Sequence, residues 1–243
     1  MKVLRAIINK EFKGYFKNYT AYIVLSVYLL LSFAATFYSA YFFEYSNNNL
    51  VSFFMYQPII LNMLIPALTM KMWAEERKLG TLEFLLTQPV NYKTLVWGKF
   101  LASAIMSCLL LVMTLPFVII SSYLVQLDIL NIISGYIGLF FTIIALCSLG
   151  CLVSAFNSNV IIAYLSSLFC GWIFIGTNFN FLLTPLKKVF TLLSSSLNGI
   201  LNFSEHYNSF VDGQIALGNI AYFISFSLLM IFLNIIIIEW HKS

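Results

Sequence analysis

Six long apolar runs divide this sequence, and no other feature limits its possible folds as strongly. The runs cover residues 19–43, 51–70, 100–125, 129–153, 160–183 and 215–238. A transmembrane helix needs roughly 20 apolar residues to cross about 30 Å of hydrocarbon. Inside lipid, a helix satisfies its backbone hydrogen bonds within its own segment. The sequence therefore predicts an all-α integral membrane protein with six transmembrane helices.

The connections between the runs are short, so we expect a single membrane domain over residues 1–243 with no soluble domain attached. Apolar residues make up 61% of the chain and charged residues 9%, whereas soluble domains average about 45–50% and about 25%. The net charge of +4 is typical of a membrane protein that keeps Lys and Arg in its cytoplasmic loops. Binding of nucleic acid is therefore not expected.

The distribution of basic residues predicts the orientation. Eleven of the 13 Lys and Arg residues lie before the first run, between the second and third runs, or after the last run, and six crossings place these segments on one side. Lys187 and Lys188 lie on the other side. Because loops rich in Lys and Arg stay in the cytoplasm, both termini are predicted to be cytoplasmic.

Two segments outside the runs have helical patterns of their own. Residues 1–18 predict an amphipathic helix at the membrane surface, with its apolar face in the acyl boundary and its cations among the headgroups. That apolar face contains Leu4, Ile7, Ile8, Phe12 and Phe16. The outer segment 184–214 contains apolar patches at 186–193 and 197–203, which predict two short re-entrant helices before the last span.

The sequence lacks the patterns expected of an enzyme or an ion-coupled transporter. No Asp, Glu, Lys, Arg or His lies in the central part of any run, although ion coupling usually needs ionisable groups at membrane depth. The phosphate-binding pattern G-x-x-x-x-G-K-[ST] is also absent. We therefore expect a non-catalytic chain that binds no cofactor and depends on a partner for energy.

Two groups of polar residues each allow two interpretations. Cys147 and Cys151 lie in an apolar run with small residues, where close helix packing is favoured over metal binding. Glu205, His206 and Asp212 lie in the outer segment, where ordinary solvation is favoured over a metal or proton role.

The densest cluster of charges lies in the segment 71–99, whose residues 75–89 read EERKLGTLEFLLTQP. Gly80 is expected to end the extension of the second span, and Thr81 to cap a new helix. Glu83 then lies in the first turn, where the helix dipole favours an anion. Pro89 limits this helix to about two turns.

The short helix predicted after Gly80 has an apolar stripe formed by Leu82, Leu85 and Leu86, spaced i, i+3 and i+4. Such a stripe needs a surface to cover it. The surface can belong to the same chain, to the membrane or to a separate cytoplasmic protein, and the pattern alone does not decide between them. Because the chain has no energy source of its own, we favour a separate motor protein.

The segment EERKLGTLEFLLTQP, followed by Lys99 before the third run, resembles the cytoplasmic loop of ABC-2 type permeases. These are the membrane subunits of one class of ATP-binding-cassette transporters. The resemblance covers most of the chain, including the basic amphipathic start, the six runs and the short helices before the last run. The segment HYNSF at 206–210, with Gly213, is most similar to the branch of gliding-motility-associated and nitrous-oxide-reductase-maturation permeases.

The resemblance implies a coupling helix that docks on a nucleotide-binding subunit. The residues it assigns to docking are Glu75, Glu76, Gly80, Thr81, Leu82, Glu83, Leu85 and Leu86. It also implies that ATP is bound by the ABC ATPase subunit, that a second permease chain, identical or homologous, completes the transporter, and that the direction is export. The location implied is the bacterial inner membrane. A lipid-acting membrane enzyme, an assembly factor or a scaffold without an ATPase partner is the alternative.

Overall fold

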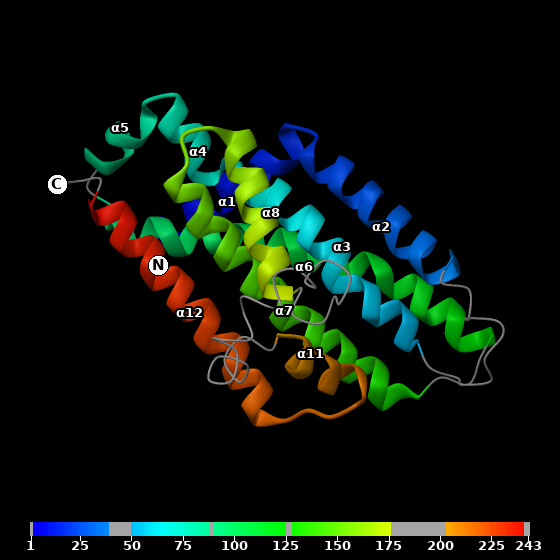
Figure 1. Cartoon of the computed structure of the whole chain (residues 1–243). Helices are drawn as coiled ribbons and strands as arrows, with labels where there is room; N and C mark the ends of the chain where they lie inside the picture. Colours follow the sequence, from blue (N-terminus) through cyan, green and yellow to red (C-terminus); the bar gives the residue numbers. More distant parts are fainter. Residues whose placement is uncertain (1, 39–49, 88–89, 125–127, 176–202, 241–243) are drawn as a thin grey trace, which may run out of the picture.

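The computed structural model describes residues 2–38, 50–87, 90–124, 128–175 and 203–240, and the regular structure in these ranges is entirely α-helical. The helices are α1 (Lys2–Lys17), α2 (Thr20–Tyr38), α3 (Val51–Thr69), α4 (Lys71–Lys78), α5 (Thr81–Thr87), α6 (Tyr92–Leu124), α7 (Ile129–Phe156), α8 (Val160–Ile175), α11 (Phe203–Val211) and α12 (Leu217–Trp240). Figure 1 shows the long helices running roughly side by side.

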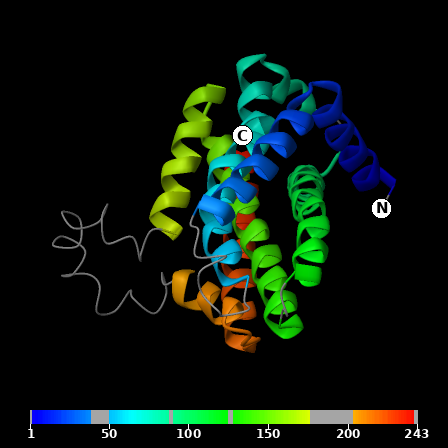
Figure 2. The ribbon, with the colours of Figure 1, turned by 90° about the vertical axis from the view of Figure 1, so that its right-hand side faces the viewer.

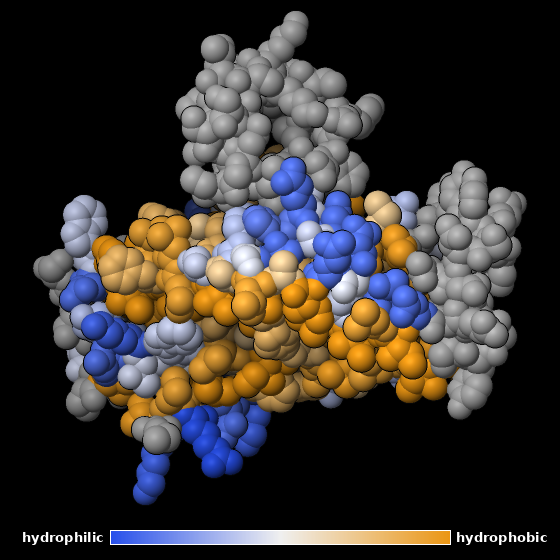
Figure 3. Space-filling model, turned by 90° about the horizontal axis from the view of Figure 1, so that it is seen from below, coloured by the Kyte–Doolittle hydropathy of each residue, from blue (hydrophilic) through white to orange (hydrophobic). Residues whose placement is uncertain are grey.

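Most of the predicted spans appear as membrane-length helices. Five stretches of the described chain are long and apolar enough to cross a bilayer, namely Thr20–Phe37, Phe53–Lys78, Tyr92–Ser121, Ile129–Phe156 and Leu217–Trp240. The predicted fifth run forms the shorter apolar helix α8, and its remaining residues 176–183 lie outside the described ranges. Figure 3 shows a broad apolar surface on one face of the molecule. The fold class, an all-α integral membrane protein, is confirmed.

Helix α7 occupies the centre of the bundle and packs against α3, α4, α6, α8, α11 and α12 (Figures 1 and 2). Its small residues permit this close approach. A Cβ atom on Gly135 would lie 2.8 Å from the Phe54 ring of α3, and one on Gly138 would lie 2.7 Å from Phe210 of α11. Larger side chains at these two positions would push both neighbours away.

Helix α1 is amphipathic as predicted, and part of its apolar face packs against protein. The face packs along the start of α6 (Figure 2), where Ile7 lies directly over Gly98. Phe12, Tyr15 and Phe16 pack against the same apolar core. The chain itself therefore covers part of this face, because a glycine on α6 lets α1 approach closely. Contact of the rest of the face with the acyl boundary stays a prediction.

Helix α6 begins earlier than the predicted third run. It starts at Tyr92, so the last residues of the predicted 71–99 loop form its first two turns. Asn91 stabilises this start, since its side-chain oxygen accepts a hydrogen bond from the backbone N–H of Lys93 (3.0 Å). Leu95 and Val96 are buried there, so protein packing maintains the helix before the apolar run begins.

Helix α11 forms in the outer segment before the last span. Its apolar side chains Phe203, Tyr207 and Phe210 are buried, and the Tyr207 hydroxyl donates a hydrogen bond to the Phe54 carbonyl of α3 (2.7 Å). Burial raises the pKa of Tyr207 well above its usual range. The predicted re-entrant helix at 186–193 lies outside the described residues, as does 197–203 except for Phe203.

Candidate functional site

The α4–α5 segment lies at one end of the long helices (Figure 1). Helix α3 continues into α4 through Met70, whose N–H bonds to the Pro66 carbonyl. The continuous stretch Phe53–Lys78 has 26 residues, about 39 Å at 1.5 Å per residue, which exceeds a hydrocarbon thickness of about 30 Å. This length is enough to cross the hydrocarbon and to leave the end of α4, with α5 after it, outside.

Gly80 ends α4 and allows the chain to turn into α5, as predicted. Its φ of +68° lies in the left-handed region that favours glycine, and its N–H bonds to the Arg77 carbonyl (3.2 Å). Helix α5 has seven residues, which agrees with the predicted length. The Thr81 hydroxyl donates to the Glu76 carbonyl (3.2 Å), so its contact is with the end of α4 rather than with α5, which the sequence predicted it to cap.

The predicted leucine stripe of α5 faces the chain itself. Leu82 is 5% exposed, and Leu85 is half-buried against the core, while the side chain of Leu86 lies outside the described structure. Leu79 and Phe84 of the same segment are 67% and 69% exposed, and both line the cavity that the segment forms with α1. The burial of Leu82 and Leu85 agrees with the predicted stripe at these two positions, and the exposed apolar side chains of the segment lie elsewhere in its sequence.

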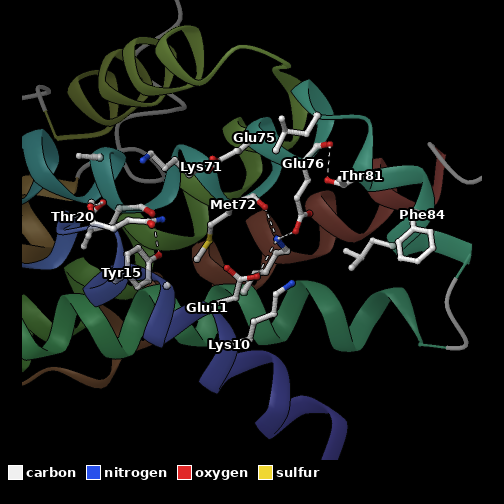
Figure 4. Close-up of a pocket in the computed structure, with 17 residues that line it drawn as sticks. Lys10, Glu11, Tyr15, Thr20, Lys71, Met72, Glu75, Glu76, Thr81 and Phe84 are labelled. Atoms are coloured by element: carbon white, nitrogen blue, oxygen red, sulfur yellow. Dashed lines mark hydrogen bonds and ion pairs between the residues drawn. The ribbon is translucent and has the colours of Figure 1, made fainter.

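The charged predicted residues divide into two groups. Glu83 is exposed in the first turn of α5. Glu75 and Glu76 on α4 are half-buried and line a cavity of about 570 Å³ between α1, α3, α4, α5 and α6. Figure 4 shows Lys71, Glu75 and Glu76 on the α4 side of this cavity, and Lys10, Glu11 and Tyr15 on the α1 side.

A buried lysine joins three helices at the base of this cavity. Lys99 of α6 is 2% exposed, and its ammonium lies 2.6 Å from Glu76 Oε1 of α4 and 3.5 Å from a carboxylate oxygen of Glu11 of α1. It also donates to the Met72 carbonyl and lies over the Trp73 ring, 4.7 Å from the centroid. A buried charge is costly unless paired, so this ion pair stabilises the arrangement of α1, α4 and α6.

Glu11 and Tyr15 are not among the site residues predicted from the sequence. Glu11 is the single acidic residue in 1–18 and falls on the apolar face, three residues after Ile8 and four after Ile7, a position that signals a buried partner. The Tyr15 hydroxyl donates to the Leu68 carbonyl of α3 (3.0 Å). Burial raises the pKa of Tyr15 well above its usual range, so the phenol stays protonated and keeps donating.

Three of the other residues considered from the sequence, His206, Cys147 and Cys151, have side-chain contacts within the chain. His206 Nδ1 lies 2.7 Å from Asn219 Oδ1, and its ring stacks on Tyr222 with centroids 4.2 Å apart. Cys147 Sγ lies 3.3 Å from the Ser107 hydroxyl of α6, and Cys151 contacts Met72 of α4. Within the described ranges, no group of three or more His, Cys, Asp or Glu side chains has the geometry of a metal site.

Comparison with known proteins gives one finding that covers almost the whole sequence. The model of a family described as ABC-2 family transporter protein matches residues 5–238. A search of curated proteins finds no match.

Proposed function

The chain belongs to the ABC-2 family of transporter proteins, and from this membership we propose that it is the permease of an exporter driven by a separate ATPase subunit. Family membership makes it a membrane subunit of an ATP-binding-cassette transporter. The sequence has no phosphate-binding loop. We therefore assign ATP binding and hydrolysis to the partner, and no catalytic role to this chain.

The observation that carries the proposal is the pair of exposed apolar side chains on the projecting α4–α5 segment. Leu79 and Phe84 are largely exposed, and they also line the cavity between α1 and α4. Exposed aromatic side chains that are rigid and apolar are frequent anchors of protein interfaces. We assign the main docking contact to Phe84, with Gly80, Thr81 and Glu83 around it, and a supporting role to Leu82 and Leu85 beneath.

The contacts of α4 supply a path from this docking surface to the membrane. Helix α4 is continuous with α3 through Met70, and the pair of Glu76 with Lys99 joins it to α6. A movement of α5 therefore acts on two spanning helices. We propose that closure of the ATPase dimer moves α4 and α5 in each of two permease chains, and that the chains rock to open an export path.

The proposed orientation follows the charge distribution. Helices α1, α4 and α5 lie at the end rich in Lys and Arg, which the positive-inside rule assigns to the cytoplasm. Both termini then lie in the cytoplasm, where an ATPase subunit has access to α5. The proposed location is the bacterial inner membrane.

The first prediction tests docking by separating the two faces of α5. Phe84→Asp places a charge in the proposed interface without changing the packing of the chain, so the ATPase subunit should no longer copurify while membrane abundance stays normal. Leu82→Asp buries a charge inside the chain, so this variant should lower the amount of the chain in membranes. The measurements are the ATPase activity of the affinity-purified preparation and the amount of the chain in membranes.

A matched control for Phe84 is Phe156, which is 64% exposed at the end of α7. It lies near α4, because Arg77 Nη1 donates to the adjacent Ala155 carbonyl (2.6 Å), but it is not part of α5. Phe156→Asp should retain ATPase activity. Retained activity in Phe84→Asp, or equal loss in both variants, would contradict docking through α5.

A further inference from the structure

The cavity between α1 and α4 combines charges of both signs with an apolar wall. Three lysines and three glutamates line it, so their formal charges cancel. Leu68 of α3 and Leu85 of α5 contribute to the apolar part. Its volume of about 570 Å³ lies within the range of about 300–1,000 Å³ typical of small-molecule sites. The lining suits an amphipathic ligand with a zwitterionic head.

Several of these charges lack a partner. Lys99 is shared by two carboxylates through Glu76 Oε1 and Glu11, which leaves one negative charge in excess. Glu76 Oε2 is buried and has no hydrogen-bond partner among the described residues. Such an oxygen is costly unless a donor reaches it. An ammonium group of a ligand would supply both the donor and the missing positive charge.

The two remaining lysines of the cavity are available to an anion. Lys10 projects from α1 and Lys71 from α4, on different sides of the cavity (Figure 4). The hydrogen bonds and ion pairs of the described chain include no partner for their ammonium groups, nor for the carboxylate of Glu75. A phosphate between the lysines would be paired, while its attached ammonium reaches the carboxylates.

The position of the cavity relative to the bilayer favours a lipid. Thr20 at the start of α2 and Leu68 near the end of α3 line it, so it lies where two helices enter the membrane. Tyr19 and Tyr22, beside it in sequence, are 72% and 54% exposed. Exposed tyrosines are enriched at the level of lipid headgroups. The cavity is therefore at headgroup depth, with Ala67 and Leu68 of the spanning helix α3 on the side of the acyl chains.

We propose that this cavity binds the headgroup of a phospholipid with a primary ammonium, such as phosphatidylethanolamine, from the leaflet on the α1 side. Lys10 and Lys71 hold the phosphate, and Glu75 and Glu76 accept hydrogen bonds from the ammonium. A primary ammonium has three N–H donors, whereas the trimethylammonium of phosphatidylcholine has none. The bound lipid would contact both α1 and α4 and so connect the two helices beside the docking segment.

The test measures lipid retention by the purified, delipidated chain in native mass spectrometry. Dioleoyl phosphatidylethanolamine, phosphatidylcholine and phosphatidylglycerol are added in equal amounts. We expect at least tenfold more bound phosphatidylethanolamine than phosphatidylcholine. Equal binding of these two lipids, or stronger binding of phosphatidylglycerol, would overturn the proposal. This experiment needs no ATPase, so its outcome is independent of the proposed transport function.

Two pairs of variants locate the site. Glu75→Gln should remove most of the preference for phosphatidylethanolamine over phosphatidylcholine, and Lys71→Gln should reduce retention of both lipids. The controls Glu83→Gln and Lys78→Gln change exposed charges nearby that do not line the cavity, and they should bind like the parent. Equal effects of the controls and the cavity variants would refute a specific site.

Two further outcomes would assign the cavity to another ligand. If soluble phosphoethanolamine displaces the lipid at equal concentration, the acyl wall contributes nothing and the lipid assignment is wrong. If Glu75→Gln leaves lipid retention unchanged but reduces copurification of the ATPase subunit, the occupant is a cationic side chain of that partner. We expect neither result.

Discussion

Lys99 lies at a position almost closed to water, and acceptors from two other helices surround its side chain there. Glu76 and Glu11 approach it from two other helices, and the Met72 carbonyl accepts a further hydrogen bond. The cost of burying an ammonium is offset when several acceptors surround it. Lys99 therefore helps to determine where α1 and α4 lie against α6.

Replacing Lys99 by methionine should destabilise the chain strongly. The variant removes the cation but leaves Glu76 half-buried beside Glu11, and breaking one side of a buried ion pair costs about 3–5 kcal/mol. The thermal midpoint of the purified protein in detergent should fall well below that of Lys93→Met, which removes an exposed lysine from the same helix.

The accompanying double variant identifies the cause. Lys99→Met combined with Glu76→Gln removes one of the unpaired carboxylates, so it should recover part of the lost stability. A Lys99→Met variant as stable as Lys93→Met would show that the ion pair contributes little.

For single residues, the sequence indicates which side chains belong to a charged site better than it indicates which of them are in contact. Glu76 and Lys99 were recognised in a charged segment, yet nothing in the local pattern pairs them with Glu11, which lies more than 60 residues earlier. Such contacts depend on how three helices pack, and helical periodicity carries no information about that packing.

At the scale of helices, periodicity correctly identified the amphipathic faces of α1 and α5 but not what covers them. The apolar face of α1 packs on α6, and Leu82 of α5 packs inside the chain. A periodic repeat of apolar residues indicates that one face of a helix is covered. The same repeat occurs whether lipid, a partner protein or the chain itself covers that face. For α1, the packing of Ile7 on Gly98 and the ion pair of Glu11 with Lys99 show that the chain itself covers part of the face.

The contact of α1 with α6 should depend on Gly98. A Cβ atom at this position would lie 2.6 Å from Cγ2 of Ile7, and Ile7 is β-branched and stiff. Gly98→Val should therefore push α1 away and increase the rate of tryptic cleavage at the exposed Lys13 and Lys17. Gly14→Ala is the matched control, because nothing lies within 4 Å of a Cβ atom there.

A compensating change distinguishes local crowding from general unfolding. Ile7→Ala in the Gly98→Val background removes the side chain that the valine meets, so cleavage should slow again. Unchanged cleavage in Gly98→Val alone would mean that α1 is not held by this contact.

For the molecule as a whole, the hydropathy of the sequence predicts the membrane-spanning architecture well and the ends of the helices poorly. The stretches Phe53–Lys78 and Tyr92–Ser121 contain 26 and 30 residues, and both extend beyond the predicted runs on the side of α1. Charged residues such as Arg77 and Lys99 lower hydropathy without ending a helix, because their partners lie on neighbouring helices. Hydropathy therefore locates the bilayer, whereas packing decides where each helix stops.

The orientation of the molecule leads to the last prediction, which single cysteines can test in intact cells. Cys108, Cys147, Cys151 and Cys170 are first replaced by alanine, and normal abundance of that background is the control for folding. Lys78 and Glu205 are both exposed, and they lie at opposite ends of the molecule, on α4 and α11 (Figure 1). Because Lys and Arg concentrate at the α4 end, a membrane-impermeant thiol reagent should label Glu205→Cys from outside and Lys78→Cys only after permeabilisation. The reverse pattern would place α5 outside the cell, where no ATP-driven partner could reach it, and would therefore overturn the proposed coupling as well as the orientation.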